Sequence, residues 1–276
     1  MAILQHPPGN MSEKSIGIFD SGIGGLTVLK AVRELLPKEN IIYFGDTARV
    51  PYGNKSPKTI IRYAIENSIF LIDKEIKLLI IACNTASAYA LDTLQRLFNI
   101  PIIGVITPCI ERVLHTSHND KIAILGTKGT ISSEAYQQEL KKKIPLASLY
   151  PIPCPLFVPL VEEYMVNHPI TLLTAKHYLQ PLKDNDVNTV ILGCTHYPWL
   201  TEVLTDALGD NTLVIDSASS CAYAAKTVLQ EQQLLSTANT PPTTTCYVSD
   251  DTDSFKRHAL KLLDINIDSY FCCGYI

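Results

Sequence analysis

The chain contains 276 residues, of which 46% are hydrophobic and 18% charged, and its net charge is −4 at pH 7. This composition is ordinary for a globular protein with length for one large domain or two ordinary ones. The slightly acidic balance argues against a nucleic-acid partner, because such proteins usually carry a basic patch. No run of about 18 apolar residues is present to span a membrane, so we expect no membrane partner either.

The cysteines and the N-terminal residues indicate a reducing compartment. Eight cysteines are too sparse for a disulfide framework in a chain of this length, and none form a Cys-x-x-Cys pair. Residues 1–14 contain no apolar segment of the kind found in signal peptides, and we expect them to form a loose extension. The sequence therefore predicts a cytoplasmic protein with free thiols.

Strand-like and helical patterns alternate along the first part of the chain. Residues 15–19 predict a strand, and a glycine-rich turn then leads into a helix over residues 26–36. Further strands are predicted at residues 40–44, 77–82 and 101–105. The run at 77–82 is almost continuously apolar, which is typical of a parallel strand covered on both faces. This order predicts a parallel α/β sheet.

The next part repeats the alternation. A strand at residues 121–125 leads through a turn into a helix around residues 134–143, and strands are predicted at 188–192 and 213–215.

The C-terminal part contains fewer elements. It predicts a helix over residues 222–235, a polar Thr/Pro segment at 236–245, a strand at 246–248 and a last helix over 255–263. This segment is too short to fold alone, so we expect it to pack back on the first domain.

Two pairs of similar segments indicate an internal duplication. Residues 16–22 align with residues 122–128, and residues 81–85 align with residues 192–196. One such pair is expected by chance between any two strand–turn–helix units. Two pairs in the same order, at similar separations, favour a duplicated unit.

Cys83 and Cys194 occupy equivalent positions in this duplication. Each directly follows a buried strand and precedes a predicted helix. Ligands bind at the carboxyl ends of parallel strands, and a helix N-terminus favours a thiolate, so we expect the pKa of both thiols to be lowered. A single buried cysteine would be explained equally well by packing. Two at equivalent points favour chemistry.

Paired thiols between two domains suit the inversion of a stereocentre. Inversion removes a proton on one face of a carbon and delivers another on the opposite face. A pseudo-symmetric protein supplies one acid/base from each half, and a thiol can serve in either protonation state. The carbanion needs many preorganised hydrogen-bond donors around the substrate carboxylate.

Such donors follow the predicted strands. The turn after Asp20 exposes backbone N–H groups and a hydroxyl, but it is not a Gly-x-Gly-x-x-Gly motif, which argues against a dinucleotide cofactor. Asp20 could pair with a substrate ammonium, orient Cys83 or cap a helix, and Ser21 offers the same cap. Further neutral polar side chains at strand ends are Asn84, Thr85, Thr127, Thr195 and His196.

His196 lies two residues after Cys194 and could tune or protonate that thiol. The Cys-x-His spacing is unlike a zinc ligand pair and no second pair accompanies it, so we predict no metal. The remaining cysteines have no comparable context, and we expect them to be structural, with the adjacent Cys272 and Cys273 open to oxidation.

These motifs together resemble glutamate racemase, a member of the aspartate/glutamate racemase superfamily, and the resemblance covers nearly the whole chain from Ser15. The segments that carry it are Asp20-Ser21-Gly22-Ile23-Gly24-Gly25, Asp46 with Pro51-Tyr52-Gly53, Ala82-Cys83-Asn84-Thr85-Ala86, Gly126-Thr127, residues 154–162 and Gly193-Cys194-Thr195-His196-Tyr197-Pro198.

The resemblance implies cofactor-independent interconversion of L- and D-glutamate, which supplies D-glutamate for peptidoglycan. It implies that Cys83 deprotonates D-glutamate with help from Asp20, and that Cys194 deprotonates L-glutamate with help from Glu162 and His196. The residues that match substrate-binding positions are Asp20, Ser21, Tyr52, Gly53, Asn84, Thr85, Thr127, Thr195 and His196.

The resemblance also implies an architecture. It is an α/β fold of two pseudo-symmetric parallel-sheet domains with the active site between them. Residues 12–107 and 218–276 would form the first domain, and residues 108–217 the second. A homodimer is common among such proteins and is a further possibility here.

Other functions remain open on sequence grounds. The same superfamily includes racemases for aspartate, and the Pro51-Tyr52-Gly53 element favours glutamate without measuring the pocket. A binding or regulatory protein could keep the fold without catalysis, although the retention of both cysteines argues against it. A thiol hydrolase needs only one cysteine, which would leave the second motif unexplained.

Overall fold

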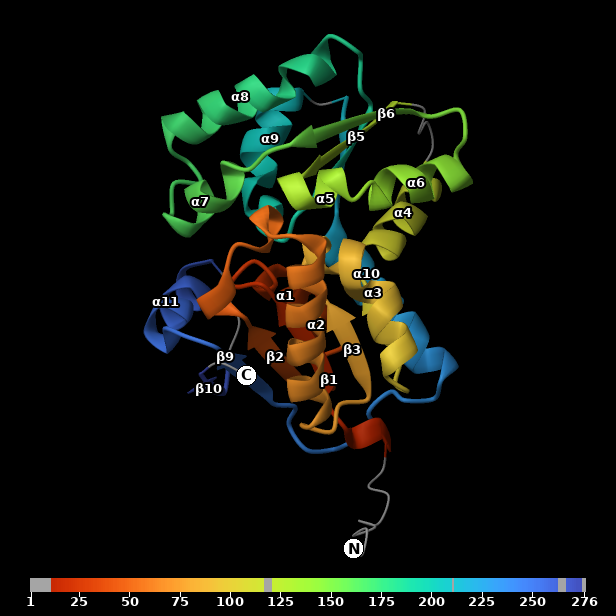
Figure 1. Cartoon of the computed structure of the whole chain (residues 1–276), viewed down its shortest axis with the longest axis vertical. Coiled ribbons are helices and arrows are strands. Elements are labelled where there is room, and N and C mark those ends of the chain that lie inside the picture. The colour runs from red at the N-terminus through yellow and green to blue at the C-terminus, as the bar shows by residue number, and fades with distance from the viewer. Residues whose placement is uncertain (1–10, 117–120, 210, 263–266, 275–276) are drawn as a thin grey trace, which may run out of the picture.

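The computed structural model describes residues 11–116, 121–209, 211–262 and 267–274. Its described strands form two separate sheets, and every strand pair in them is parallel. In Figure 1 one sheet lies in the lower half of the molecule and the other in the upper half. The expected class, two parallel-sheet α/β units, is confirmed.

The first sheet has six strands in the order β10-β9-β2-β1-β3-β4. Their bounds are β1 Ile16–Asp20, β2 Ile41–Gly45, β3 Leu78–Ile81, β4 Ile102–Gly104, β9 Thr244–Val248 and β10 Ser269–Cys272. The C-terminal strands β9 and β10 extend the edge next to β2, so the end of the chain completes the first sheet as expected.

The second sheet has four strands in the order β6-β5-β7-β8. Their bounds are β5 Lys121–Gly126, β6 Ser148–Pro153, β7 Thr189–Gly193 and β8 Leu213–Asp216. This order matches β2-β1-β3-β4 of the first sheet strand for strand. The duplication inferred from sequence therefore agrees with the topology, because β1 corresponds to β5 and β3 corresponds to β7.

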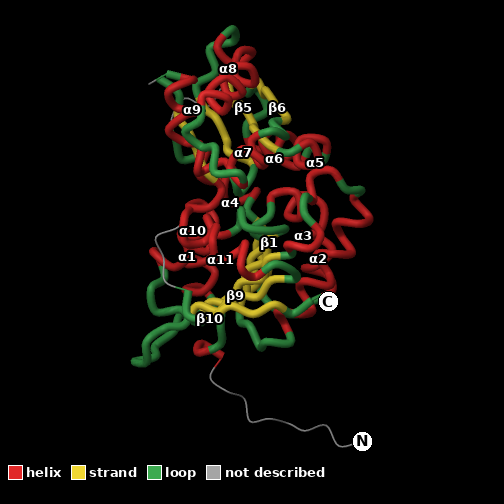
Figure 2. The backbone as a smooth tube through the Cα atoms, turned by 90° about the vertical axis from the view of Figure 1, so that its left-hand side faces the viewer, coloured by secondary structure: helices red, strands yellow, loops and turns green. Residues whose placement is uncertain are grey.

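Helices cover both sheets, as Figures 1 and 2 show. Those on the first sheet are α1 Leu26–Leu35, α2 Pro57–Ile72, α3 Asn84–Leu97, α10 Ser217–Glu231 and α11 Thr252–Leu262. The others are α4 Ile106–Leu114, α5 Lys128–Ser132, α6 Ala135–Lys143, α7 Phe157–Glu162, α8 Pro169–Lys183 and α9 Thr201–Leu208. The short 3₁₀ helices are Met11–Glu13, Thr47–Arg49, Tyr52–Asn54 and Tyr197–Leu200.

The central strands of the first sheet are buried on both faces. In β3, Leu78 and Ile80 join the apolar cluster that includes α1 and α10, whereas Leu79 and Ile81 join the cluster beneath α2 and α3. All four side chains are fully buried. The alternation of side chains along a strand explains why a run without polar residues forms here.

Most predicted elements agree with the observed bounds to within one residue, but three differ by more. The strand predicted at residues 246–248 is β9, which starts at Thr244, and the helix predicted at residues 222–235 ends at Glu231. This helix is α10, which starts at Ser217 because the Asp216 carboxylate caps it by accepting the Ser219 N–H at 2.7 Å. The last helix starts at Thr252 rather than at 255, and residue 263 lies outside the described residues. The expected N-terminal extension lies largely outside them too, since residues 1–10 are not described.

The chain passes between the two sheets at α4 and again from β8 into α10. The boundary predicted at residues 107 and 108 falls within α4, and the boundary predicted at 217 and 218 falls after the first residue of α10. The exact bounds of the domains stay a prediction. Among the described residues, no helix has the length and hydrophobicity needed to cross a membrane.

Candidate active site

The two cysteines singled out by sequence lie at equivalent ends of equivalent strands. Cys83 follows β3 and is the N-cap residue of α3, whereas Cys194 follows β7 and precedes a 3₁₀ helix rather than an α-helix. Cys83 is 6% exposed to solvent and Cys194 is 5% exposed. Both line the same cavity, whose volume is about 30 Å³. The duplicated fold therefore brings one thiol from each half to a shared space.

Side chains from both halves line this cavity. They are Ser21, Val50, Pro51, Tyr52, Gly53, Cys83, Asn84, Thr85, Thr127, Val158, Glu162, Cys194, Thr195 and His196. Every predicted site residue except Asp20 belongs to this wall. Val50, Pro51 and Val158 were not predicted as site residues, although each adjoins or lies within a motif that carried the resemblance. Apolar side chains give no chemical signal, so their contribution to the wall was missed.

Asp20 lies behind the wall, fully buried at the end of β1. Its carboxylate accepts the Gly22 N–H at 3.0 Å and the Thr195 hydroxyl at 3.3 Å. Burial raises the pKa of Asp20, and the nearby His196 ring counteracts part of that increase. Asp20 thus belongs to the first sheet yet contacts Thr195, which follows a strand of the second.

Burial also governs the thiol of Cys83. Burial, the larger cause, and the neighbouring Asp20 carboxylate both raise the pKa of Cys83, whose net value is about 12. Hydrogen bonds from the backbone N–H groups of Ala86 and Thr85 and from Ser21 lower it. The predicted net decrease in pKa is therefore wrong for this closed structure: the helix N-terminus acts in the expected direction, but loss of solvent outweighs it.

The Cys194 thiol faces a chain of polar groups. His196 Nδ1 lies 3.9 Å from Cys194 Sγ, and His196 Nε2 lies 3.1 Å from Glu162 Oε1. An imidazole that donates from Nε2 to the carboxylate presents the lone pair of Nδ1 to the thiol. Burial raises the pKa of Cys194 well above its ordinary value, although a backbone hydrogen bond from His196 lowers it. Here too, the predicted net decrease is wrong.

Hydroxyl and amide groups close the cavity between the halves. Thr85 Oγ1 lies 2.9 Å from Thr127 Oγ1 and 3.1 Å from Thr130 Oγ1. The Asn84 side chain accepts from the Tyr136 hydroxyl at 2.7 Å and donates to the Ser217 hydroxyl at 3.2 Å. These contacts join residues of α3 to residues of α5, α6 and α10.

The loop that carries Tyr52 and Gly53 is held from behind. The Tyr52 hydroxyl donates to the buried Asp46 carboxylate and accepts from Asn67 Nδ2 at 3.0 Å, and neither partner is among the described residues that line the cavity. Gly53 packs against Thr127, and a Cβ at position 53 would lie 2.7 Å from the Thr127 Cβ. The backbone of this loop therefore packs directly against a side chain of the other half of the molecule.

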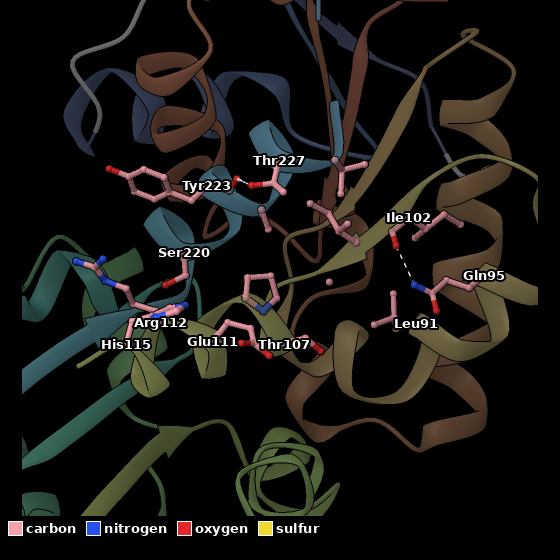
Figure 3. Close-up of a pocket in the computed structure, with 15 residues that line it drawn as sticks. Leu91, Gln95, Ile102, Thr107, Glu111, Arg112, His115, Ser220, Tyr223 and Thr227 are labelled. Carbon is pink, nitrogen blue, oxygen red and sulfur yellow. Dashed lines mark hydrogen bonds between the residues drawn. The ribbon is translucent and has the colours of Figure 1, made fainter. Parts of the chain in front are cut away.

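A second cavity is larger but lies elsewhere. It has a volume of about 540 Å³ and is formed by residues of α3, β4, α4 and α10. Figure 3 shows Arg112 and His115 at one end of this cavity and Gln95 at the other. Neither Cys83 nor Cys194 is among the described residues that line it. Judged by volume alone, this larger cavity would be the candidate active site. The side chains predicted to carry the chemistry line the smaller cavity instead.

Metal binding finds no support in the geometry of the described residues. Among them, no group of three or more His, Cys, Asp or Glu side chains is arranged to hold a metal ion.

Known proteins resemble this chain over almost its full length. Residues 24–225 match the model of the Asp/Glu/Hydantoin racemase family. Glutamate racemase of Geobacter metallireducens is 45% identical over 253 residues, covering 92% of this chain and 94% of that protein.

Solved structures agree with this result. A glutamate racemase isoform of Bacillus anthracis superimposes with a TM-score of 0.91 at 35% identity, covering 95% of this chain and 98% of that one. Glutamate racemase of Francisella tularensis, solved in complex with D-glutamate, gives a TM-score of 0.89 at 39% identity with the same coverage. The chain therefore belongs to the Asp/Glu/Hydantoin racemase family and, within it, to the glutamate racemases.

Proposed function

We propose that this protein interconverts L- and D-glutamate without a cofactor, with Cys83 and Cys194 as its two acid/base residues. The observation that supports this most directly is the placement of two buried thiols at equivalent strand ends, lining one cavity from opposite halves of a duplicated fold. One thiol on each side of a carbon is the arrangement that inversion requires.

The reaction follows from that placement. Starting from L-glutamate, the Cys194 thiolate removes the α-proton and becomes a thiol, while the Cys83 thiol delivers its proton to the opposite face of the α-carbon. The product is D-glutamate, and Cys83 is left as a thiolate. The reverse reaction exchanges the two roles, so each enantiomer is deprotonated by a different cysteine.

Because the pKa values of both thiols are raised, we propose that the bound substrate itself helps to form the thiolate. A buried thiolate is costly without a cation nearby, and the α-ammonium of glutamate is such a cation. Its entry beside the thiols lowers their pKa values. At Cys194, Nδ1 of His196 accepts the thiol proton, and Glu162 stabilises the resulting imidazolium. At Cys83, the buried Asp20 assists proton transfer, as His196 and Glu162 do at Cys194.

Substrate recognition is assigned to the polar wall. Ser21, Asn84, Thr85, Thr127, Thr195 and His196 offer hydroxyl, amide and imidazole groups to the two carboxylates, while Tyr52 and Gly53 contribute the loop that covers them. Hydrogen bonds to the α-carboxylate stabilise the carbanion as charge moves onto its oxygens.

The closed cavity has a consequence for binding. Its volume of about 30 Å³ leaves little room for a substrate the size of glutamate. We infer that the two halves separate to admit glutamate and close again around it. Closure excludes water from the thiolate and from the carbanion.

The choice of substrate rests on the relatives. The Francisella tularensis protein was solved with D-glutamate bound, and we infer the same ligand here. Aspartate is the alternative, and faster turnover of aspartate than of glutamate would reverse the choice. We further propose, from the family resemblance, a cytoplasmic location, a role in supplying D-glutamate for peptidoglycan, and a homodimer, which light scattering in solution would test.

Substitution of each cysteine tests the two-base mechanism. Cys83→Ala and Cys194→Ala should each lower the racemisation rate by about a hundredfold to ten-thousandfold, the range for loss of a general acid/base. Cys272→Ala is the matched control, because this exposed cysteine lies in β10, away from the cavity. Circular dichroism establishes that each variant is folded. Full activity in either single active-site variant would contradict the mechanism.

A further inference from the structure

Helix α11 of the first sheet contacts the end of α7 on the other side of the active site. Figure 1 shows α11 beneath α7. The contact is made by His258, whose Nε2 lies 2.9 Å from the backbone carbonyl oxygen of Glu162. Its Nδ1 lies 2.8 Å from the carbonyl oxygen of Ser254, one turn earlier in α11. The ring therefore links two helices from the two halves of the molecule.

The geometry of this ring is specific. Both partners are carbonyl oxygens, which only accept hydrogen bonds, so whichever ring nitrogen carries a proton has an acceptor in place. The ring also stacks on Tyr164, with centroids 4.8 Å apart and planes 19° apart. Tyr164 has a φ of 56°, a left-handed conformation that is costly for a bulky residue. His258 thus fixes both the last carbonyl of α7 and the turn that ends it.

The anchored residue is the one that supports Cys194. Glu162 contacts His258 through its backbone, while its carboxylate lies 3.1 Å from His196 Nε2. His196 in turn adjoins Cys194 Sγ at 3.9 Å. A continuous set of contacts therefore runs from a helix of the first half to the thiol of the second.

We propose that His258 is a positioning residue for catalysis, acting through Glu162 on the Cys194 side of the active site. This inference rests on the proposed function. His258 does not line the cavity and touches no reacting atom; it holds the end of α7 so that the Glu162 carboxylate meets His196 when the halves are closed. Its effect should therefore be confined to the step at Cys194.

The first test compares three variants of the full chain. His258→Ala removes the ring and its hydrogen bonding to these carbonyl oxygens, and should lower kcat by roughly threefold to tenfold, the range for about one such bond. His258→Gln keeps an amide donor for the Glu162 carbonyl and should recover part of this loss. His177→Ala is the control, because His177 is exposed on α8, away from this contact. Thermal unfolding is recorded for all three, and at least one His258 variant must be folded at the assay temperature.

The second test asks whether the effect passes through Glu162. In a Glu162→Gln background, His258→Ala should cause little further loss, because the two substitutions affect one unit. The deuterium isotope effect on kcat/KM should increase for α-deuterated L-glutamate, whose proton Cys194 removes, and not for α-deuterated D-glutamate. If His258 had only a structural role, His258→Ala would cause the same loss in both Glu162 backgrounds, and the isotope effect would not differ between the two enantiomers.

The outcomes are distinct. Wild-type kcat in both folded His258 variants, equal losses in the two Glu162 backgrounds, or equal isotope effects for the two enantiomers would each overturn the positioning role while leaving the racemase function intact. If the wild-type chain does not racemise glutamate, the proposed function fails and this inference falls with it.

Discussion

Gly24 is the position where a single added methyl group should do most damage to the site. It lies in the turn between β1 and α1, which packs against Thr195 and His196 of the other half of the molecule. A Cβ at this position would lie 2.3 Å from Thr195 Oγ1 and 2.4 Å from His196 Nδ1, whereas ordinary contact begins at 3.4 Å. Gly24→Ala must therefore displace these side chains, or the halves themselves, by about 1 Å.

The magnitude follows from that displacement. A misplacement of about 1 Å can cost roughly a hundredfold in rate, and overpacking of a buried contact costs about 1–3 kcal/mol in stability. We expect kcat for either enantiomer to fall about a hundredfold, measured by the change in optical rotation. The unfolding temperature should fall by several degrees, the shift that a loss of about 1–3 kcal/mol gives in a chain of this size.

Gly209→Ala provides the matched control. Gly209 has a φ of 92°, and a Cβ there would have no heavy atom within 4 Å. This substitution strains the backbone at a cost of about 1–2 kcal/mol but leaves the site untouched, so its kcat should be that of the wild type. Wild-type kcat in folded Gly24→Ala would refute the argument that close contact at Gly24 shapes the site.

Three further predictions concern charge and protonation. Glu162→Gln removes the charge beside His196 and should cost about 1.5–3 kcal/mol in the rate-limiting barrier, roughly tenfold to a hundredfold in kcat, and an unchanged rate would exclude its role. Lys77→Met leaves the Glu39 carboxylate, 2.5 Å from the Lys77 ammonium, buried without its partner. Lys77→Met should lower the unfolding free energy by about 3–5 kcal/mol in denaturant titration, and the double variant that also carries Glu39→Gln should recover part of this loss. If the losses of the two single variants simply add in the double variant, the two residues do not act as an ion pair. Burial raises the pKa of Cys221 to about 12, so the folded chain holds this proton more tightly than the unfolded chain. Its contribution to stability is complete below about pH 8.5 and is lost as pH rises towards 12. The unfolding temperature of Cys221→Ala should therefore fall less steeply than that of the wild type across this range, and parallel curves would contradict the argument.

The sequence predicted the fold well where the pattern is set by burial. Runs of mostly apolar residues identified the inner strands β1, β3, β5 and β7, because the middle of a parallel strand covered on both faces is apolar. The edge strand β6 was missed, since it contains Pro151 and Pro153, which argue against a strand unless it lies at an edge. Register and strand order depend on contacts between distant segments, which no local pattern specifies.

The sequence predicted most residues of the cavity wall but not their electrostatics. Cysteines and polar residues at strand ends identified nearly the whole cavity wall. The direction of the thiol pKa shifts was wrong, because the helix N-terminus is visible in the sequence whereas the depth of burial is not. His258 also gave no signal, since its role depends on the carbonyl oxygen of Glu162 in the other half of the molecule.

Exchange of the α-proton in deuterated buffer tests the central claim most directly. The folded, reduced protein is incubated with L- or D-glutamate, without added cofactor, and followed by NMR and polarimetry. Two opposed thiols predict deuterium at the α-carbon of the product and loss of optical activity from either enantiomer. No exchange and no loss of rotation from either enantiomer would contradict the assignment of Cys83 and Cys194 as a racemising pair.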